Sequence, residues 1–169
     1  MRLTEEYYLQ SAKVLAKDLL GKVLCVRNNK EIMKLRITET ECYFSESDTA
    51  CHAHKGKTER TKILYKKGGR AYVYLCYGMY NLFNVVTGEE DLPQAVLIRG
   101  VEGYDGPGKL AKAMGIDRRF NDADLTTSED IWIEDWGEKK PKFKRDKRVG
   151  IGYASEKDQE RLWRYIVIE

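Results

Sequence analysis

The chain has 169 residues, of which 42% are hydrophobic and 34% are charged, and its formal net charge is +3. This composition is typical of a globular protein large enough to bury a core, and we expect residues 1–169 to form a single domain. No run of about 18 apolar residues is present, which excludes a membrane-spanning helix. The opening MRLTEEYYLQ lacks the apolar region of a signal peptide, so we expect a cytoplasmic protein with reduced cysteines.

The first predicted element is a helix over residues 4–20, capped by Thr4 and with an apolar face at helical spacing. Two strands follow, KVLCVR and IMKLRITETECYF, joined into a hairpin at residues 28–30. Residues 45–70 are polar and basic and are expected to form mainly a long loop, which is usually functional or disordered. The run RAYVYLCYGMYNLFNVV is rich in β-branched and aromatic residues and is expected to break at Gly78.

The second half continues with the strand QAVLIRGV, a helix that starts near Pro107 and the short strand DIWIED. KRVGIGY is strand-like, and Ser155 can cap a short stretch before the closing strand LWRYIVI. Neighbouring runs of strands, with helices at the edges instead of strict alternation, predict one α+β domain. We expect a curved, largely antiparallel β-sheet with peripheral helices.

The positive charge is concentrated in two segments. Residues 52–70 hold seven Lys/Arg against one acid, and residues 139–148 hold seven against one acid. The intervening residues 115–138 hold eight acids and two arginines. The two basic segments can together form a face that binds a polyanion, whereas solvated loops would show the same charge pattern.

ITETECYF, residues 37–44, places two acids in a predicted strand. Because side chains alternate between the two faces of a strand, residues 37, 39, 41 and 43 are expected on one side. The simplest interpretation is a solvated face, since two neighbouring carboxylates repel and neither belongs in a core unless it is paired. The functional interpretation is a carboxylate held beside Tyr43, ionised at neutral pH and able to orient and deprotonate a water molecule.

Three other motifs carry weaker signals. CHAH contains both histidines of the chain, but its spacing matches no standard zinc pattern, so we expect no metal site. GYDGPGKL is similar to a phosphate-binding loop, except that Leu110 replaces the Ser or Thr that would hold magnesium, and a structural turn is favoured. Tyr72, Tyr74, Tyr77 and Tyr80 fit ordinary sheet packing, and beside basic loops they also fit stacking on bases.

The order of the motifs is more informative than any one of them: ETECY, ACHAHKG followed by TER, YVYLCYGMYNLFNVV, VLIRGVE, GPGKLAKAMGI and RVGIGYA. Over nearly the whole chain, this order resembles the alkyladenine (3-methyladenine) DNA glycosylase family. The resemblance implies a monofunctional enzyme that flips damaged purines out of double-stranded DNA, alkylated adenine first, with hypoxanthine and ethenoadenine as further candidates. Such an enzyme hydrolyses the N-glycosidic bond and leaves an abasic site in base excision repair.

The resemblance implies no cofactor or metal. We expect a monomer, which suits scanning along DNA, with no membrane association, that acts in the cytoplasm, at the nucleoid in a bacterium. By the same resemblance, Glu41 is the general base that activates water. Arg99 lies near that water and the target-site backbone, and Glu39 is a supporting acid that pairs with a basic neighbour. Tyr43 shares the face of Glu41 because base and water must be held in one pocket.

Further positions match the family's base pocket. Tyr43, His52 and Tyr74 correspond to the walls that sandwich the flipped base, whose electron-poor ring stacks well on electron-rich ones. Asn84 corresponds to a residue that crowds the 2-amino group of guanine. Tyr77 corresponds to the side chain that intercalates into the duplex and fills the vacated gap.

Contacts to the DNA backbone would come from the basic loop, through Lys57, Thr58 and Arg60. The chain departs from the family at two positions near the site. Cys42 stands where alanine is common and could make the site oxidisable, and His54 stands where a small residue such as serine is usual. The ending RYIVIE stops short of a C-terminal segment that many members carry.

The same sequence features are compatible with two other classes of protein. A nucleic-acid-binding module without catalysis would use the same basic loops and tyrosines, but it gives no reason for Glu41 to face a pocket. A glycosidase acting on sugars would need two carboxylates that flank the scissile bond. Glu39 and Glu41 are instead expected to point in parallel toward the same side.

Overall fold

The computed structural model describes residues 1–169. The strands are β1 (Val23–Asn28), β2 (Glu31–Phe44), β3 (Ala71–Cys76), β4 (Tyr80–Val86), β5 (Gln94–Val101), β6 (Tyr104–Asp105), β7 (Ile131–Glu134), β8 (Phe143–Asp146) and β9 (Arg164–Val167). The helices are α1 (Glu5–Tyr8), α2 (Ala12–Asp18), α3 (Pro107–Met114) and α4 (Glu156–Gln159), with the short 3-10 helices η1 (His52–Lys55), η2 (Lys62–Tyr65) and η3 (Arg118–Phe120). None of these helices is long and apolar enough to cross a lipid bilayer.

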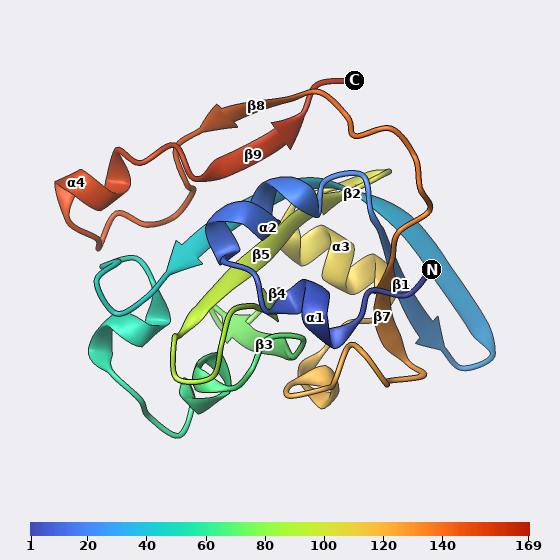
Figure 1. Cartoon of the computed structure of the whole chain (residues 1–169), viewed down its shortest axis with the longest axis horizontal. Coiled ribbons are helices and arrows are strands. Elements are labelled where there is room, and N and C mark those ends of the chain that lie inside the picture. Colours follow the sequence, from blue (N-terminus) through green and yellow to red (C-terminus); the bar gives the residue numbers. More distant parts are fainter.

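The nine strands form one sheet in which every pairing is antiparallel. The central order is β3-β4-β5-β2-β1-β7, while β6 pairs with β5 and β9 joins β2 to β8. Figure 1 shows the sheet curving through the molecule, with α1, α2 and α3 near the middle of the view and α4 at its left edge. The predicted α+β class, with a curved and largely antiparallel sheet, is confirmed.

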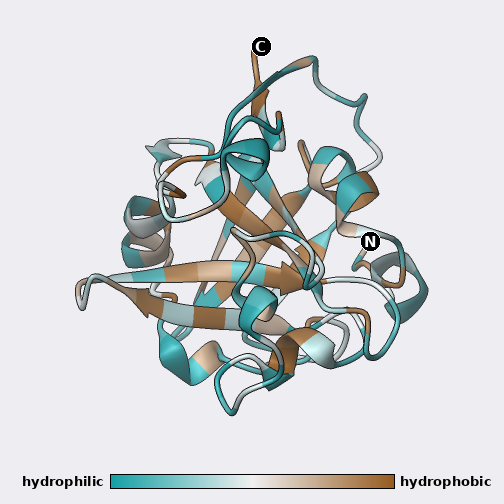
Figure 2. Cartoon of the chain, turned by 90° about the vertical axis from the view of Figure 1, so that its left-hand side faces the viewer, coloured by the Kyte–Doolittle hydropathy of each residue, from teal (hydrophilic) through white to brown (hydrophobic).

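The predicted hairpin at residues 28–30 and the predicted break at Gly78 are also confirmed, and the break is a second hairpin. Asn29 lies in the turn between β1 and β2 with a φ of 56°. Between β3 and β4, Tyr77 and Gly78 have φ values of 53° and 67°, and the Met79 N–H donates to the carbonyl of Cys76 over 3.1 Å. Two successive positive φ angles define a type I′ turn, whose twist matches that of the flanking strands. In Figure 2 this hairpin is the arm that extends to the left of the molecule.

The prediction of one continuous helix over residues 4–20 is wrong, because two short helices, α1 and α2, form there instead. Ser11 begins α2 by accepting a hydrogen bond from the Lys13 N–H (3.1 Å), whereas the Thr4 side chain makes no capping bond. The carbonyl of buried Tyr8 accepts a hydrogen bond from the Gly88 N–H (2.8 Å). A distant loop therefore takes the acceptor that a continuous helix would have used.

The segment KRVGIGY, residues 147–153, forms turns and bends instead of the predicted strand. The strand of this region, β8, ends just before it at Asp146. Gly150 has a φ of 74°, which is incompatible with a strand, and Arg148 turns inward to pair with Asp48, 100 positions earlier. A long-range ion pair, invisible in the local pattern, decides the conformation here.

Strand β2 contains an irregularity that its alternating pattern does not show. Its register with β5 shifts between Ile37 and Glu39 and again between Glu39 and Thr40. Ile37 therefore packs in the main core together with Cys42, although simple alternation would place it beside Glu39 and Glu41. The prediction of a shared face is wrong for Ile37 and confirmed for the two acids, which share an arginine partner.

The two faces of the sheet meet different surroundings. One face packs against α2 and α3 and holds the main hydrophobic core. The loop of residues 45–70, broken only by η1 and η2 as predicted for a mainly irregular segment, forms a smaller apolar cluster with the other face. That second face also borders a cavity, which its alternate strand residues line: Tyr72, Tyr74, Leu82, Asn84, Ala95, Leu97 and Arg99.

Candidate active site

The cavity has a volume of about 650 Å³, within the range of about 300–1,000 Å³ usual for sites that hold small ligands. Its walls come from β2 to β5, from the loop before η1, from the start of α3 and from residues 149–153. Six of the predicted site residues line it: Tyr43, His52, Tyr74, Tyr77, Asn84 and Arg99. Residues far apart in the sequence thus meet in one apolar pocket.

One wall of the cavity is aromatic. The rings of His52 and Tyr74 have centroids 4.5 Å apart, and Tyr72 lies 5.5 Å from Tyr74. The Tyr72 hydroxyl is hydrogen-bonded to Nδ1 of His52 (2.8 Å), which fixes the orientation of the imidazole. Burial lowers the pKa of His52 to about 4, assisted by the charges of Arg60 and Lys55. The imidazole is therefore neutral at pH 7 and offers the cavity an uncharged face.

Glu41 lies directly behind the cavity wall and is fully buried. Its Oε1 accepts a hydrogen bond from the Tyr43 hydroxyl (2.7 Å), and its Oε2 accepts one from the Val149 N–H (2.7 Å). The Nε of Arg99 lies 3.7 Å from Oε2. Burial raises the pKa of Glu41, and these three neighbours oppose the rise, Arg99 most strongly. Tyr43, Val149 and Arg99 all line the cavity, so only one layer of side chain and backbone separates the carboxylate from it.

Glu39 is the second acid on this face and is nearly buried. Its Oε2 accepts hydrogen bonds from Arg99 Nε (3.0 Å) and Arg164 Nη1 (3.1 Å). The prediction that Glu39 pairs with a basic neighbour is confirmed. Because Arg99 lies between the two carboxylates, it also relieves the repulsion that made two acids on one strand face unexpected.

Asn84 and Tyr77 occupy opposite extremes of exposure in the β3–β4 hairpin. Asn84 is buried at the cavity wall, and its Nδ2 donates to the carbonyl of Tyr72 (3.2 Å). Tyr77 is 85% exposed at the tip of the hairpin. Its positive φ is costly for a side chain with a Cβ atom, and such conformations cluster at functional sites.

The three residues predicted to contact the DNA backbone lie in the loop beside the cavity. The guanidinium of Arg60 lies 5.4 Å from the centroid of the Tyr74 ring, and the Lys57 ammonium lies 5.6 Å from that of Tyr65. Neither forms an ion pair. The hydroxyl of Thr58 is hydrogen-bonded to that of Thr61 (3.1 Å) and shapes the turn between them.

Many positive charges of the two basic segments already form ion pairs within the protein, so fewer are available to bind a polyanion than the sequence count indicates. In the first segment, Lys62, Lys66, Lys67 and Arg70 pair with nearby acids. In the second, the same holds for Lys140, Lys142, Lys147 and Arg148. The unpaired charges next to the cavity are therefore few, with Lys57 and Arg60 among them.

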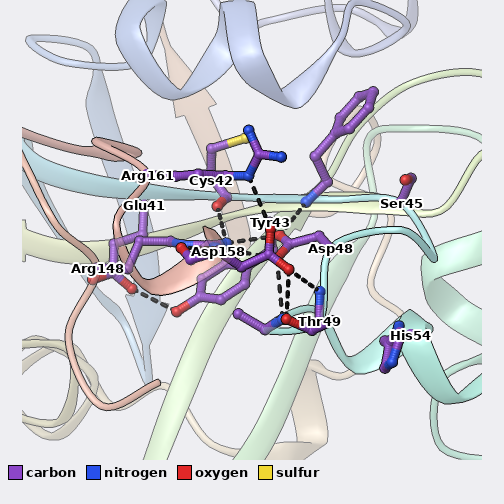
Figure 3. Close-up of polar contacts among 12 residues, drawn as sticks. Glu41, Cys42, Tyr43, Ser45, Asp48, Thr49, His54, Arg148, Asp158 and Arg161 are labelled. Carbon is purple, nitrogen blue, oxygen red and sulfur yellow. Dashed lines mark hydrogen bonds and ion pairs between the residues drawn. The ribbon is translucent and has the colours of Figure 1, made fainter. Parts of the chain in front are cut away.

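Sequence reasoning missed a group of residues behind Tyr43 (Figure 3). Arg148 lies in a basic segment and begins the RVGIGYA motif, and Asp48 lies in a polar loop, but neither pattern indicates that the two residues pair. In the structure they form a buried ion pair with a separation of 2.7 Å. The Val149 amide that binds Glu41 was missed as well, because a backbone donor has no sequence signal. The one available hint was the pair of acids Glu46 and Asp48 at the start of a loop otherwise expected to bind anions.

The two departures from the family pattern have different surroundings. Cys42 points into the main core and is fully buried, and burial raises the pKa of its thiol to about 12. Since the thiolate is the form that oxidises readily, the expectation of an oxidisable site at Cys42 is wrong. His54 is exposed and hydrogen-bonds through Nδ1 to the carbonyl of Glu46 (2.7 Å), away from the cavity residues.

A family model described as methylpurine-DNA glycosylase matches residues 6–105 and 103–169. Several similar proteins carry the name "Putative 3-methyladenine DNA glycosylase". That of Borreliella burgdorferi is 41% identical over 95% of this chain and 93% of its own length. Those of Methanocella arvoryzae and Clostridium novyi are each 40% identical, over 96% and 98% of this chain and 90% and 94% of their own.

These matches agree with the resemblance that the motif order indicated. They cover the strand that carries Glu41, the hairpin that carries Tyr77 and the closing segment that carries Arg148. Identities near 40% over almost the full length of each protein exclude a match confined to one motif. The chain belongs to the methylpurine-DNA glycosylase family of DNA-repair enzymes.

Proposed function

We propose that this chain is a monofunctional glycosylase that extrudes an alkylated adenine from duplex DNA into the cavity and hydrolyses its N-glycosidic bond. Hypoxanthine and ethenoadenine are further candidate substrates. The observation that carries the proposal is the Glu41 carboxylate, buried but held by three residues that line the cavity: Tyr43, Arg99 and Val149. A binding module without catalysis has no use for a carboxylate in this position.

The reaction requires a water molecule between Glu41 and C1′ of the sugar. Arg99 and Val149 both contact Oε2 of Glu41, at 3.7 and 2.7 Å, and both face the cavity. A water seated between them would reach that oxygen and give up its proton to it. The water oxygen then bonds to C1′, while the electron pair of the N-glycosidic bond leaves with the base. The carboxylate charge also stabilises the oxocarbenium-like transition state.

The cavity walls suit an electron-poor purine. Alkylation withdraws electron density from the base, which strengthens its attraction to the ring faces of Tyr43 and Tyr74. His52 adds a third aromatic face without a positive charge that would repel such a base. Asn84 at the wall would crowd the 2-amino group of guanine, so that normal guanine is rejected.

The remaining predicted residues would act on the duplex. Tyr77, at the exposed tip of the hairpin, would enter the base stack and fill the gap left by the flipped nucleotide. Lys57, Thr58 and Arg60 would contact phosphates, which gives binding that depends on salt and not on sequence. We infer that the enzyme works as a monomer on DNA in the cytoplasm.

The test is base release from a duplex that carries one hypoxanthine, with alkylated DNA as a second substrate. Treatment with hot alkali then reveals abasic sites. Glu41→Gln should lower the single-turnover rate by about 10²–10⁴-fold, the usual contribution of a general base, while binding to the duplex is kept. Glu102→Gln is the matched control, because Glu102 is an exposed acid that pairs with Arg36 and lies outside the cavity wall.

Release by the wild type and the control, with loss in Glu41→Gln, would support the proposal. Binding without release from either substrate would leave a nucleic-acid-binding module as the better description. Release at the wild-type rate by Glu41→Gln would keep the glycosylase activity but remove Glu41 from the role of base. Cleavage of the DNA strand without alkali would contradict a monofunctional mechanism.

A further inference from the structure

Arg148 is buried in a corner where three segments of the chain meet (Figure 3). Its side chain and that of Asp48 are 0% and 1% exposed. Nη1 donates to Oδ2 of Asp48 (2.7 Å) and Nη2 donates to Oδ1 (3.0 Å), which makes the pair bidentate. The same nitrogens also donate to the carbonyl oxygens of Cys42 (3.0 Å) and Asp158 (3.1 Å). Strand β2, the loop before η1 and the end of α4 are thus joined through one guanidinium.

Asp48 extends this anchor toward the cavity. Its Oδ2 accepts a hydrogen bond from the Phe44 N–H and its Oδ1 accepts one from the Ala50 N–H, both at 3.0 Å. Ala50 lines the cavity two residues before His52. The position of the loop that carries the imidazole therefore depends on the same carboxylate that binds Arg148.

Arg148 is also adjacent in sequence to a residue that donates a hydrogen bond to Glu41. Val149 follows it directly and donates its N–H to Oε2 of Glu41 (2.7 Å). The chain then continues through Gly150 and Gly152, and glycine restricts the backbone less than any other residue. The buried side chain of Arg148 consequently anchors the backbone here and fixes the orientation of the Val149 N–H.

The second donor of Glu41 is in contact with Arg148 as well. The guanidinium carbon lies 4.9 Å from the centroid of the Tyr43 ring and 5.0 Å from that of Trp163. Tyr43 donates its hydroxyl to Oε1 of Glu41 (2.7 Å). Through a stacked ring on one side and an adjacent amide on the other, Arg148 constrains the partners of both carboxylate oxygens.

We propose that Arg148 is a positioning residue for base release: it holds the Tyr43 hydroxyl and the Val149 amide against Glu41 and so keeps the carboxylate oriented toward the water. This inference rests on the proposed function, in which Glu41 is the base. Stability alone does not account for the arrangement. Replacing a buried ion pair by apolar residues of similar volume is often neutral or stabilising, and Nε of Arg148 has no hydrogen-bond partner.

Three variants separate positioning from packing. Arg148→Met combined with Asp48→Asn removes both charges, so neither is left buried alone. Arg148→Lys keeps the positive charge but loses the planar fork that binds Asp48 with two nitrogens. Arg161→Met is the matched control: Arg161 pairs with Asp158 (2.9 Å) and lies 4.7 Å from the centroid of the Trp163 ring in the same corner, without contacting Tyr43.

The readout is the single-turnover rate of base release from the hypoxanthine duplex, measured across pH together with duplex affinity. The double variant should lose about 10²-fold in rate, the effect of misplacing a reacting group by about 1 Å, with duplex affinity little changed. Arg148→Lys should lose rate to a smaller extent, and Arg161→Met should match the wild type.

The pH profile supplies a signature that packing alone would not produce. The groups that face Glu41 are Arg99, Tyr43, the Val149 N–H, Arg148, Glu39, Tyr74 and Tyr153. Arg148 is one of the groups that lower the pKa of the carboxyl against the effect of burial. In the double variant the two lost charges largely offset each other, but the hydrogen bonds from Tyr43 and Val149, which also lower the pKa of this carboxyl, should loosen. The acid limb of the profile should therefore move to higher pH in the double variant, and less in Arg148→Lys.

A wild-type rate and an unmoved acid limb in the double variant and in Arg148→Lys would overturn the inference. So would an equal loss at every pH with the limb of the double variant unmoved, since that result indicates packing alone. If the double variant does not fold, Arg148→Lys decides: a lower rate with the folded state intact supports positioning, and a wild-type rate rejects it. Glu41→Gln is run beside them. If it releases base normally, the proposed base is wrong whatever Arg148 does; if it is inactive while the Arg148 variants are not, only the inference on Arg148 fails.

Discussion

Neighbouring residues of the same strand lie on opposite faces of the sheet, one in the hydrophobic core and the other at the cavity. In β4, Phe83 is fully buried in the main core, whereas Asn84 lines the cavity and hydrogen-bonds to a backbone carbonyl. In β3, Val73 belongs to the core and Tyr74 to the cavity wall. The core side is apolar and needs only close packing. The cavity side buries polar groups, and each of these has to be matched with a partner.

This difference shows where each kind of information lies. A core side chain can be exchanged for another of similar volume at modest cost, so it says little about chemistry. A buried carboxylate is tolerated only with specific donors, and the donors of Glu41 come from β2, β5 and the loop after β8. The cavity side therefore depends on contacts between distant segments, and substitutions on the two sides should have separable consequences.

The largest expected effect on stability comes from the core side. Phe83→Ala should lower the free energy of unfolding by about 3–5 kcal/mol, the usual cost of deleting a buried phenylalanine. Asn84→Ala, one residue away, loses the hydrogen bond to the Tyr72 carbonyl (3.2 Å) and a longer one to the Leu82 carbonyl (3.5 Å), and it should cost about 0.5–1.5 kcal/mol. Urea unfolding of the two variants measures both values. Equal losses would remove the distinction between the two faces.

The largest expected effect on binding comes from the aromatic wall of the cavity side. Tyr74→Ala should weaken the flipped-base complex by about 1–3 kcal/mol, because one stacking surface is lost. Tyr74→Phe keeps the ring and serves as the control. Affinity for a duplex with a lesion, compared with an undamaged duplex, isolates the stacking contribution. A loss of the same size on undamaged DNA would argue against a role for Tyr74 in base binding.

The pH dependence of base release should also report on the cavity side. A general base works only when ionised, so the rate should rise with pH through the raised pKa of Glu41 and fall about tenfold for each unit below it. The pKa of His52 is lowered to about 4 by its burial, so its imidazole is uncharged at neutral pH. His52→Phe should therefore leave the position of the acid limb unchanged. Disappearance of the limb in this variant would assign it to His52.

The smallest expected effect concerns the loop that covers the cavity side. Lys57→Gln and Arg60→Gln should each reduce the slope of log affinity against log salt by about 1, since each removes one phosphate contact. Lys66→Gln is the control, because Lys66 already pairs with Asp122 (2.7 Å). Duplex binding measured at several salt concentrations gives the slopes. A larger change for Lys66 than for Arg60 would place the DNA elsewhere on the surface.

Much of the fold follows from local signals in the sequence. The turn residues around Asn29 marked the first hairpin, Gly78 marked the break between β3 and β4, and Pro107 marked the start of α3. Strand alternation is sufficient to predict that Glu39 and Glu41 share one face. The order of the motifs indicated the family and so the roles of residues that periodicity alone leaves ambiguous.

The remainder depends on contacts that no local pattern encodes. The pair between Arg148 and Asp48 spans 100 positions, and it turns a strand-like segment into a loop whose amide binds Glu41. The bulge that places Ile37 in the core and the bond from Gly88 to Tyr8 that ends α1 are of the same kind. In each case tertiary hydrogen bonding overrides a propensity that is weak over a few residues.

The type I′ turn that contains Tyr77 has a thermodynamic consequence for DNA binding. Ordering the backbone of a flexible loop costs about 1–2 kcal/mol of conformational entropy per residue each time it is ordered. Here Tyr77 lies in the three-residue connection between the paired residues Cys76 and Tyr80, so its backbone is already ordered when the chain folds. A side chain carried in this way can probe many undamaged sites in succession without a repeated entropic penalty for the segment that carries it.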